Sequence, residues 1–353
     1  MTDMPSQIIP STLLMIAGFF LTLAVFWAAR PMAHKVGLVD KPGGRKQHEG
    51  AIPLIGGLVI ITIFMVLGLI AKMQDTINFL PLMGGVLFLL TVGTLDDKFH
   101  VHAWVRFVIQ IWVSCYIVIF CGAEIENLGN LLGFGEIDLG YAAKPFSVTC
   151  FVLLMNAINM MDGLDGLVGG FMVIVLGWLA FVYYQAGSVF HAQTIALLLA
   201  PLIAFLFLNM RHPLRKKACV FLGDAGSLSL GLLLGFFAIS AAKGQGVDFI
   251  LPPVAIIWFV GVPVIDAFSL FFVRLKRGGH PFEADRLHLH YKLVDRGIAP
   301  QYATPLMLAL SFLFCAVGYF GAAFNVPEYI LTYSWTALLL GYTFYNLKYD
   351  VMR

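Results

Sequence analysis

The chain has 353 residues, of which 60% are hydrophobic and only 12% are charged. Soluble globular domains carry about 25% charged residues, so this composition indicates a membrane protein rather than a soluble one. The net charge of +2 argues against nucleic acid as a partner, because such proteins gather Lys and Arg on a water-soluble surface. The five cysteines show no C-x-x-C spacing, so no cysteine metal or redox site is predicted.

Long apolar runs recur along the whole chain. A helix needs about 20 apolar residues to cross the hydrocarbon core, where its backbone must satisfy its own polar groups. The pattern therefore predicts an all-α polytopic membrane protein with about 11 transmembrane helices (10 or 11), because only a Gly/Asp-rich turn separates the fifth run from the sixth. The predicted spans are residues 8–29, 51–71, 79–95, 104–122, 146–161, 167–186, 190–209, 219–241, 249–273, 302–323 and 329–347.

No segment resembles a soluble domain or a flexible linker, so residues 1–353 are interpreted as one membrane domain. The first run lacks a basic n-region and is too long for a signal peptide, which predicts a retained first helix. With the N-terminus outside, 19 of the 22 Lys and Arg residues fall inside, and only Lys72, Lys144 and Lys243 remain outside. The positive-inside rule thus predicts a periplasmic N-terminus and places the chemistry in short cytoplasmic loops and helix ends.

The first polar group is Asp96-Asp97, where the third run meets the predicted cytoplasmic face. Adjacent carboxylates repel each other, which raises the proton affinity of one of them or favours a bound cation. Arg106 follows near the start of the next span, where it could face a phosphate. The alternative interpretation of the two acids is a solvated helix end.

The second group is the stretch Asn156 to Gly166, in which Asn156, Asn159 and Asp162 recur every three residues and therefore share one side of a helix. Asp165 follows in the glycine-rich turn. Amides and acids beside an apolar span are costly without a partner, so a binding role is favoured over a simple helix cap.

The third group is Phe221-Leu222-Gly223-Asp224 at the entrance of the eighth span. Asp224 is either a helix N-cap or, with Asn159, half of a Mg²⁺ site, since Mg²⁺ uses few protein oxygens and also binds substrate phosphates. Asp266 lies within the ninth run, where an ionisable group is costly. Sequence alone does not separate a functional role for Asp266 from helix pairing.

Two basic segments complete the set. The loop after the ninth run holds Arg286, His288 and His290, and the loop after the first run holds Lys46 and His48. Cations around acids that bind Mg²⁺ are suited to a pyrophosphate ligand. A zinc site at the two histidines and a plain solvated basic loop are the alternatives.

Together these motifs resemble the polyprenyl-phosphate N-acetylhexosamine-1-phosphate transferases, and most closely the bacterial undecaprenyl-phosphate GlcNAc-1-phosphate transferases. The resemblance runs almost end to end. It rests on Val39-Asp40-Lys41-Pro42, Arg45-Lys46-x-His48, Ile52-Pro53-Leu54-Ile55-Gly56-Gly57, Asp96-Asp97, Asn156-x-x-Asn159-x-x-Asp162-Gly-x-Asp165-Gly, Phe221-x-Gly223-Asp224 and Asp285-Arg286-x-His288-x-His290.

The resemblance implies that a cytosolic nucleotide sugar, UDP-GlcNAc, gives its sugar 1-phosphate to undecaprenyl phosphate in the bacterial inner membrane, with release of UMP. This reaction begins a lipid-linked cell-surface glycan such as O-antigen. The implied cofactor is Mg²⁺, with Mn²⁺ as a substitute, held by Asp224 and Asn159. A homodimer is compatible with this interpretation, and membrane lipids are the expected surroundings.

The remaining roles also follow from the resemblance. Asp96 or Asp97 is implied as the catalytic base or the nucleophile, and Arg106 as a phosphate contact. The implied substrate-binding residues are Lys46, His48, Asn156, Asp162, Asp165, Asn209, Arg286, His288 and His290. Tyr291 departs from the family pattern, which has a third histidine at this position, and this weakens any role that depends on that histidine.

Two rival functions remain open from sequence. A transferase that uses the muramyl-pentapeptide nucleotide shares the Asp-Asp and Asp-Gly-x-Asp-Gly motifs, and donors such as UDP-GalNAc or UDP-linked 6-deoxy amino sugars also fit. A transporter or lipid flippase would place ionisable residues near the middle of the bilayer, and Asp266 alone matches that pattern.

Overall fold

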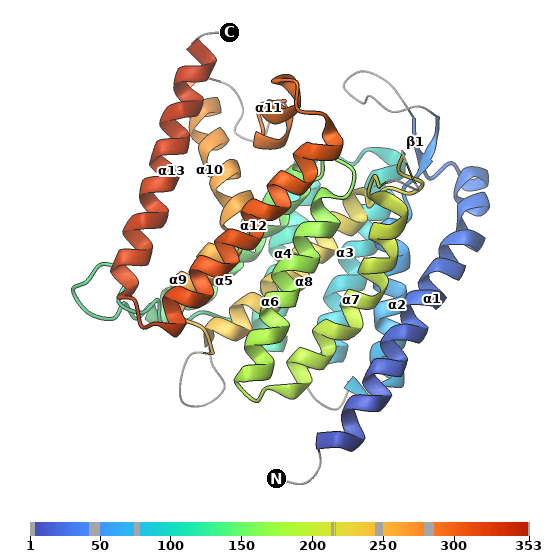
Figure 1. Ribbon diagram of the computed structural model, residues 1–353, viewed down its shortest axis with the longest axis horizontal. Coiled ribbons are helices and arrows are strands. Elements are labelled where there is room, and N and C mark those ends of the chain that lie inside the picture. Colours follow the sequence, from blue (N-terminus) through green and yellow to red (C-terminus); the bar gives the residue numbers. More distant parts are fainter. Residues whose placement is uncertain are drawn as a thin grey trace.

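The computed structural model describes residues 4–41, 50–73, 78–212, 215, 217–243, 250–278 and 286–351. Within them the chain is a bundle of long helices, with α1 (Met4–Val36) beginning at the end opposite to the C-terminus (Figure 1). Lys46 and His48, predicted to bind substrate, lie outside the described residues.

Helices occupy every predicted apolar run, which confirms the all-α class. The ninth run is divided between α9 and α10. The elements after α1 are β1 (Val39–Asp40), β2 (Ile52–Pro53), α2 (Gly56–Ile70), α3 (Phe79–Phe99), α4 (Ala103–Cys121), η2 (Gly140–Ala142), α5 (Ala143–Met161), α6 (Leu167–Gln185), α7 (Val189–Asn209), α8 (Gly223–Lys243), α9 (Pro253–Phe259), α10 (Gly261–Lys276), α11 (Leu289–Asp295), α12 (Pro300–Ala323) and α13 (Glu328–Val351).

Among the described residues, eight helices are long and apolar enough to cross a membrane, or nine if the bent pair α9–α10 is one span. The protein is therefore a multi-pass membrane protein. Helix α2 is apolar but has only 15 residues, and α13 is outside this set. The total of 11 spans stays a prediction.

Helix α8 forms the centre of the bundle. Almost all of its residues are buried, and it packs against α2, α3, α5, α6 and α9. A helix that is apolar on all sides is stable only when other helices surround it. By contrast α1, α4 and α12 expose large apolar side chains such as Trp27, Trp112 and Phe312, as expected of helices that face lipid.

Small residues let the backbone of α8 approach its neighbours closely. A Cβ atom on Gly57 of α2 would lie 2.2 Å from the Cα of Gly226, and one on Gly93 of α3 would lie 2.4 Å from the Cα of Ala225. Such contacts between small residues allow membrane helices to pack without large side chains between them. The first turn of α8 is therefore held directly against α2 and α3.

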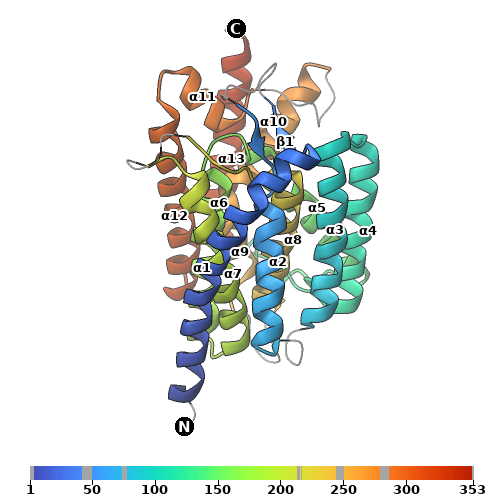
Figure 2. The ribbon, with the colours of Figure 1, turned by 90° about the vertical axis from the view of Figure 1, so that its right-hand side faces the viewer.

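The segment before α8 is paired with the segment before α2. Strands β1 and β2 form an antiparallel pair, and the Phe221 N–H donates to the Pro53 carbonyl at 2.8 Å. The Gly56 N–H in turn donates to the Phe221 carbonyl at 2.9 Å. Both views show β1 at the same end of the bundle as α11 and the C-terminal end of α13 (Figures 1 and 2), and we call this end the site end.

The ninth span is sharply bent. Helices α9 and α10 meet at 81°, and Pro263 lies in the first turn of α10. Proline has no N–H, so it cannot donate to the carbonyl of Phe259 four residues earlier. The Cys315 thiol of α12 contacts that carbonyl instead, at 3.7 Å. The bend sends α10 toward the site end alongside α13.

The close packing of α8 can be tested with Gly57→Ala. Its new methyl group would meet backbone atoms of Gly226, which cannot rotate away, so we expect a loss of roughly 1–3 kcal/mol in stability. The matched control is Gly177→Ala in α6, where a Cβ meets nothing within 4 Å and the better helix propensity of Ala should add up to about 1 kcal/mol. The apparent melting temperatures of both variants in detergent provide the measurement. Equal changes in apparent melting temperature for the two variants would contradict the close contact between Gly57 and Gly226.

Candidate active site

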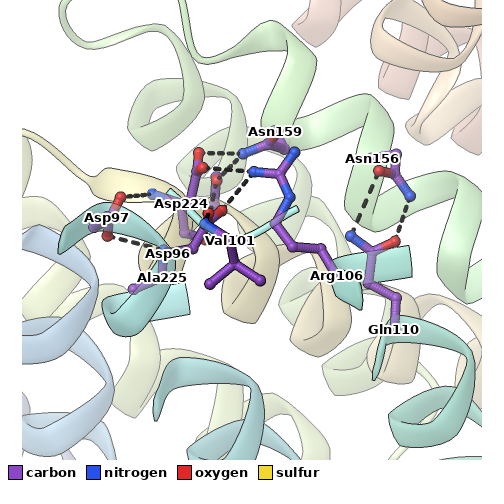
Figure 3. A network of polar contacts seen from close by, with 10 residues as sticks. Asp96, Asp97, Val101, Arg106, Gln110, Asn156, Asn159, Asp224 and Ala225 are labelled. Carbon is purple, nitrogen blue, oxygen red and sulfur yellow. Dashed lines mark hydrogen bonds and ion pairs between the residues drawn. The ribbon is translucent and has the colours of Figure 1, made fainter. Parts of the chain in front are cut away.

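Arg106 joins two carboxylates that are far apart in the sequence. Its Nη1 lies 2.5 Å from Asp96 Oδ2 and 2.9 Å from Asp224 Oδ2 (Figure 3). Asp96 comes from the end of α3, Arg106 from the first turn of α4 and Asp224 from the first turn of α8. Because Asp96 is buried, it needs this partner, and its other oxygen accepts the Val101 N–H at 2.8 Å.

Asp97 binds the N-terminus of α8. Its two carboxylate oxygens accept the backbone N–H groups of Asp224 at 2.8 Å and Ala225 at 3.2 Å. Free N–H groups and the positive end of the helix dipole favour an anion at this position. Gly223 makes the contact feasible, because its φ is +75° and a Cβ would lie 2.5 Å from Asp97 Oδ2.

Asn159 completes the cluster from the last turn of α5. Its Nδ2 donates to Asp224 Oδ1 at 2.7 Å and lies 2.9 Å from the Ser227 hydroxyl. One turn earlier, Asn156 Nδ2 donates to Gln110 Oε1 at 2.6 Å, and Gln110 is buried in α4. Asn159 thus faces the acids, whereas Asn156 holds α5 against α4 (Figure 3).

The turn after α5 brings a further carboxylate to the cluster. The side chain of Asp162 reaches solvent, but the surrounding protein desolvates its carboxyl group and the charges of Asp224 and Asp97 add to this, raising its pKa to about 7. Among the described residues, Arg106 forms ion pairs with Asp96 and Asp224, whereas Asp97 binds backbone N–H groups. The cluster therefore has an excess of negative charge that a cation would relieve.

Asp165 and Asn209 are occupied by the protein itself. Asp165 Oδ2 accepts from Arg211 Nε at 2.7 Å. The buried Asn209 amide accepts the Gly166 N–H at 2.7 Å and donates to the Val220 carbonyl at 2.9 Å. These contacts fasten the 162–166 turn to the segment that leads into α8, so both residues shape the site. Whether they also touch a ligand stays a prediction.

Residues 286–292, which we call the histidine segment, lie against the same turn. His290 is buried at the start of α11, and its pKa is lowered to about 3, mainly by burial and then by His288. A Cβ on Gly163 would lie 2.2 Å from His290 Nε2 and 2.7 Å from the Tyr291 hydroxyl. The guanidinium of Arg286 lies over the Tyr291 ring, 4.7 Å from its centroid. Arg286, His290 and Tyr291 therefore gather beside the 162–166 turn.

The donor atoms suit a hard cation that also binds phosphate. Among the described residues, no three His, Cys, Asp or Glu side chains form a metal-binding group. Mg²⁺, however, often takes only one or two protein oxygens and completes its coordination with water and substrate phosphates. Asp224 and the amide of Asn159 fit that requirement. Zinc at His288 and His290 does not fit, because Nδ1 of His288 binds Asp266 and its Nε2 faces the Arg274 guanidinium at 3.4 Å.

The structure thus brings together Asp96, Asp97, Arg106, Asn159 and Asp224, and it places His290 beside Gly163 with Arg286 over the adjacent Tyr291 ring. The catalytic and ligand-binding roles of these residues stay predictions. Sequence analysis missed Gln110 and the supporting role of Arg211. Gln110 carried a signal, since it is a polar residue within the fourth apolar run, one turn after Arg106. The pairing of Asp165 with Arg211 carried none, because it depends on the tertiary fold.

Comparisons with known proteins agree with this architecture. The sequence pattern described as glycosyl transferase family 4 matches residues 79–242. The chain is 31% identical over 318 residues to undecaprenyl-phosphate alpha-N-acetylglucosaminyl 1-phosphate transferase of Yersinia pestis, covering 89% of this chain and 85% of that protein. It is also 31% identical to the proteins of the same name from Escherichia coli K12, over 91% of this chain and 86% of that protein, and Haemophilus influenzae, over 93% and 90%.

The buried, neutral His290 has a measurable consequence. Its folded pKa of about 3 lies below the ordinary value of 6.5, so the unfolded chain binds a proton more readily below pH 6.5. The contribution of His290 is therefore fully present above pH 6.5 and lost as the pH falls, by about 2 kcal/mol between pH 7.5 and 5.0. The variant His290→Gln should show a smaller fall in apparent melting temperature over this range. Identical pH dependences of the two proteins would refute a neutral buried histidine.

Proposed function

The chain belongs to the family of undecaprenyl-phosphate N-acetylglucosaminyl 1-phosphate transferases within glycosyl transferase family 4, and we propose that it transfers GlcNAc-1-phosphate from UDP-GlcNAc to undecaprenyl phosphate. The products are UMP and undecaprenyl-diphospho-GlcNAc. The observation that carries the proposal is the convergence of Asp96, Asp97, Arg106, Asn159 and Asp224 from four helices at one end of the bundle.

The location of the cluster suits the two substrates. A nucleotide sugar is water-soluble, whereas the acceptor is a lipid whose phosphate lies at the headgroup plane, so they can react only at a membrane boundary. The cluster lies at the ends of α3, α4, α5 and α8 rather than in the middle of the bundle. The Lys and Arg distribution supports a cytoplasmic site end, and the bacterial relatives support a place in a bacterial inner membrane.

Charge neutralisation is the main chemical task of the site. Phosphoryl transfer depends on positioning and on stabilising the negative charge of the transferring group. Mg²⁺ held by Asp224 and Asn159 would neutralise the pyrophosphate of the donor, and Mn²⁺ has the same preference for oxygen donors. Arg106 is half-exposed between the two acids, so its guanidinium can contact phosphate oxygens.

The acceptor requires little general-base catalysis. The second pKa of a phosphate monoester is about 6, so at neutral pH the lipid phosphate is mostly the dianion. We therefore assign the attack on the β-phosphorus to a phosphate oxygen of the lipid. Asp96 and Asp97 then fix Arg106 and the N-terminus of α8, and either one can take the proton from the remaining monoanion.

The donor sugar is identified by a product assay. Purified protein with undecaprenyl phosphate and Mg²⁺ should release UMP from UDP-GlcNAc at least tenfold faster than from UDP-GalNAc or UDP-MurNAc-pentapeptide, because one mismatched sugar hydroxyl leaves buried polar groups unpaired. Mass spectrometry of the lipid product from the mixed donors identifies the sugar. Exclusive use of the peptide-bearing donor would overturn the assignment to GlcNAc but leave the reaction class intact.

Asp224→Asn tests the proposed cation site. The substitution keeps the size of the side chain but removes the charge next to Asn159 and Arg106, so we expect a loss of at least about 100-fold in Mg²⁺-dependent UMP release. The control is Glu136→Gln, an exposed acid that contacts Asn127 in the loop between α4 and α5 and should leave the rate unchanged. Unchanged turnover in the Asp224 variant would remove this residue from the mechanism.

A further inference from the structure

Asp266 is a buried acid bound to the histidine segment. It lies in α10, beyond the bend from α9, and its Oδ2 lies 2.7 Å from Nδ1 of His288. Its Oδ1 accepts the Leu289 N–H at 3.1 Å and the Tyr342 hydroxyl at 2.8 Å. One carboxylate therefore receives three donors, two from the start of α11 and one from α13.

The contacts of His288 define its tautomer. Its Nε2 lies 3.4 Å from Nη2 of Arg274. Because a guanidinium can only donate, Nε2 must be the acceptor in this contact, so the ring proton is on Nδ1 and is donated to Asp266. The ring is buried, and both nitrogens face protein groups. In this structure His288 is thus oriented away from solvent and toward α10.

His290 takes its position from His288. The two imidazole rings are nearly parallel, with an interplanar angle of 8° and centroids 5.7 Å apart. His290 Nε2 is buried and has no hydrogen-bond partner among the described residues, and it faces Gly163 in the turn that carries Asp162. An unpaired buried nitrogen is costly unless a ligand binds it. The orientation of His290 Nε2 therefore depends on the position of the parallel His288 ring.

A second chain of bonds holds α11 on the same helices. Lys292 Nζ donates to Asn346 Oδ1 of α13 at 2.5 Å, and Asn346 Nδ2 donates to the Ser269 hydroxyl of α10 at 2.6 Å. All three residues are buried. Helix α11 has only seven residues and could not keep its position without such contacts.

We propose that Asp266, supported by Tyr342, is a positioning residue that fixes His288 and the start of α11 so that His290 is presented to the Asp162–Gly166 turn. This rests on the proposed transferase function. It explains why an acid lies in an apolar run: its three bonds anchor a short helix at the site end. A proton or ion pathway would instead leave the carboxylate free to exchange partners.

An amide cannot replace this carboxylate. Asp266 offers oxygens to three donors, whereas Asn has one oxygen and an NH₂ group that would oppose the N–H of His288 or of Leu289. Asp266→Asn should therefore turn His288 away and displace His290. A displacement of about 1 Å in a positioning group can lower turnover by about 100-fold, which is the expected fall in kcat for UMP release.

The test combines Asp266→Asn with His288→Ala. If Asp266 acts through His288, adding Asp266→Asn to the His288→Ala protein should lower the rate by less than about threefold, because the positioned ring is already absent. Hydrogen exchange of the backbone amides in 286–295 should rise in Asp266→Asn with other helices unchanged. Additive rate losses, or wild-type rate and exchange in Asp266→Asn, would overturn the inference.

Tyr342→Phe keeps the inference testable if Asp266→Asn does not fold. It removes one of the three donors, and we expect a rate loss of about three- to tenfold with faster exchange in 286–295. Tyr333→Phe is the matched control, since it removes a hydroxyl from the same helix that donates to the Leu132 carbonyl at the opposite end. Equal behaviour of the two variants would overturn the proposal. A wild-type protein that releases no UMP would refute the proposed function. Hydrogen exchange of the backbone amides in 286–295 would still test whether Asp266 positions this segment.

Discussion

The salt-bridge arrangement of Arg106 between Asp96 and Asp224 is the interaction on which the site depends. Buried carboxylates are stable only when a cation or several N–H donors compensate the water they lose. Arg106 supplies the cation, and the N-terminus of α8 supplies two N–H donors to Asp97. Because these partners come from α3, α4 and α8, the charges can be compensated only when the three helix ends meet. The charges of the site are therefore compensated only in the correctly packed bundle.

The close packing around α8 makes that meeting feasible. Gly57 and Gly93 bring the backbones of α2 and α3 against the first turn of α8. The bonds between the segments that precede α2 and α8 fix the direction from which α8 starts. Small residues thus decide where the acids lie, although they carry no chemistry themselves. A larger side chain at these contacts would move Asp224 away from Arg106 and Asn159.

Sequence alone predicted the helices well and marked the acids that the structure brings together, because both leave strong local signals. The roles of these acids stay predictions. Apolar runs of about 20 residues have little alternative to a helix in a membrane, and acids at the ends of such runs are conspicuous. Pro263 favours a bend in the ninth run, but the bend angle depends on packing against α12. The partners of Asp165, Asn156 and Asp266 were missed because they come from distant helices, and a periodic pattern in one segment does not specify what faces it. The number of spans and the orientation stay predictions.

The site has two parts with different physical demands. The charge cluster lies within residues 79–242, the range matched by the glycosyl transferase family 4 pattern. The histidine segment lies outside that range and is held by hydrogen bonds from α10 and α13. Tyr291, at the position where the sequence resemblance implies a third histidine, contacts the same turn as His290. Substitutions in the histidine segment can alter which ligand binds at the Asp162–Gly166 turn while the charge cluster stays intact, because the two parts are anchored on different helices.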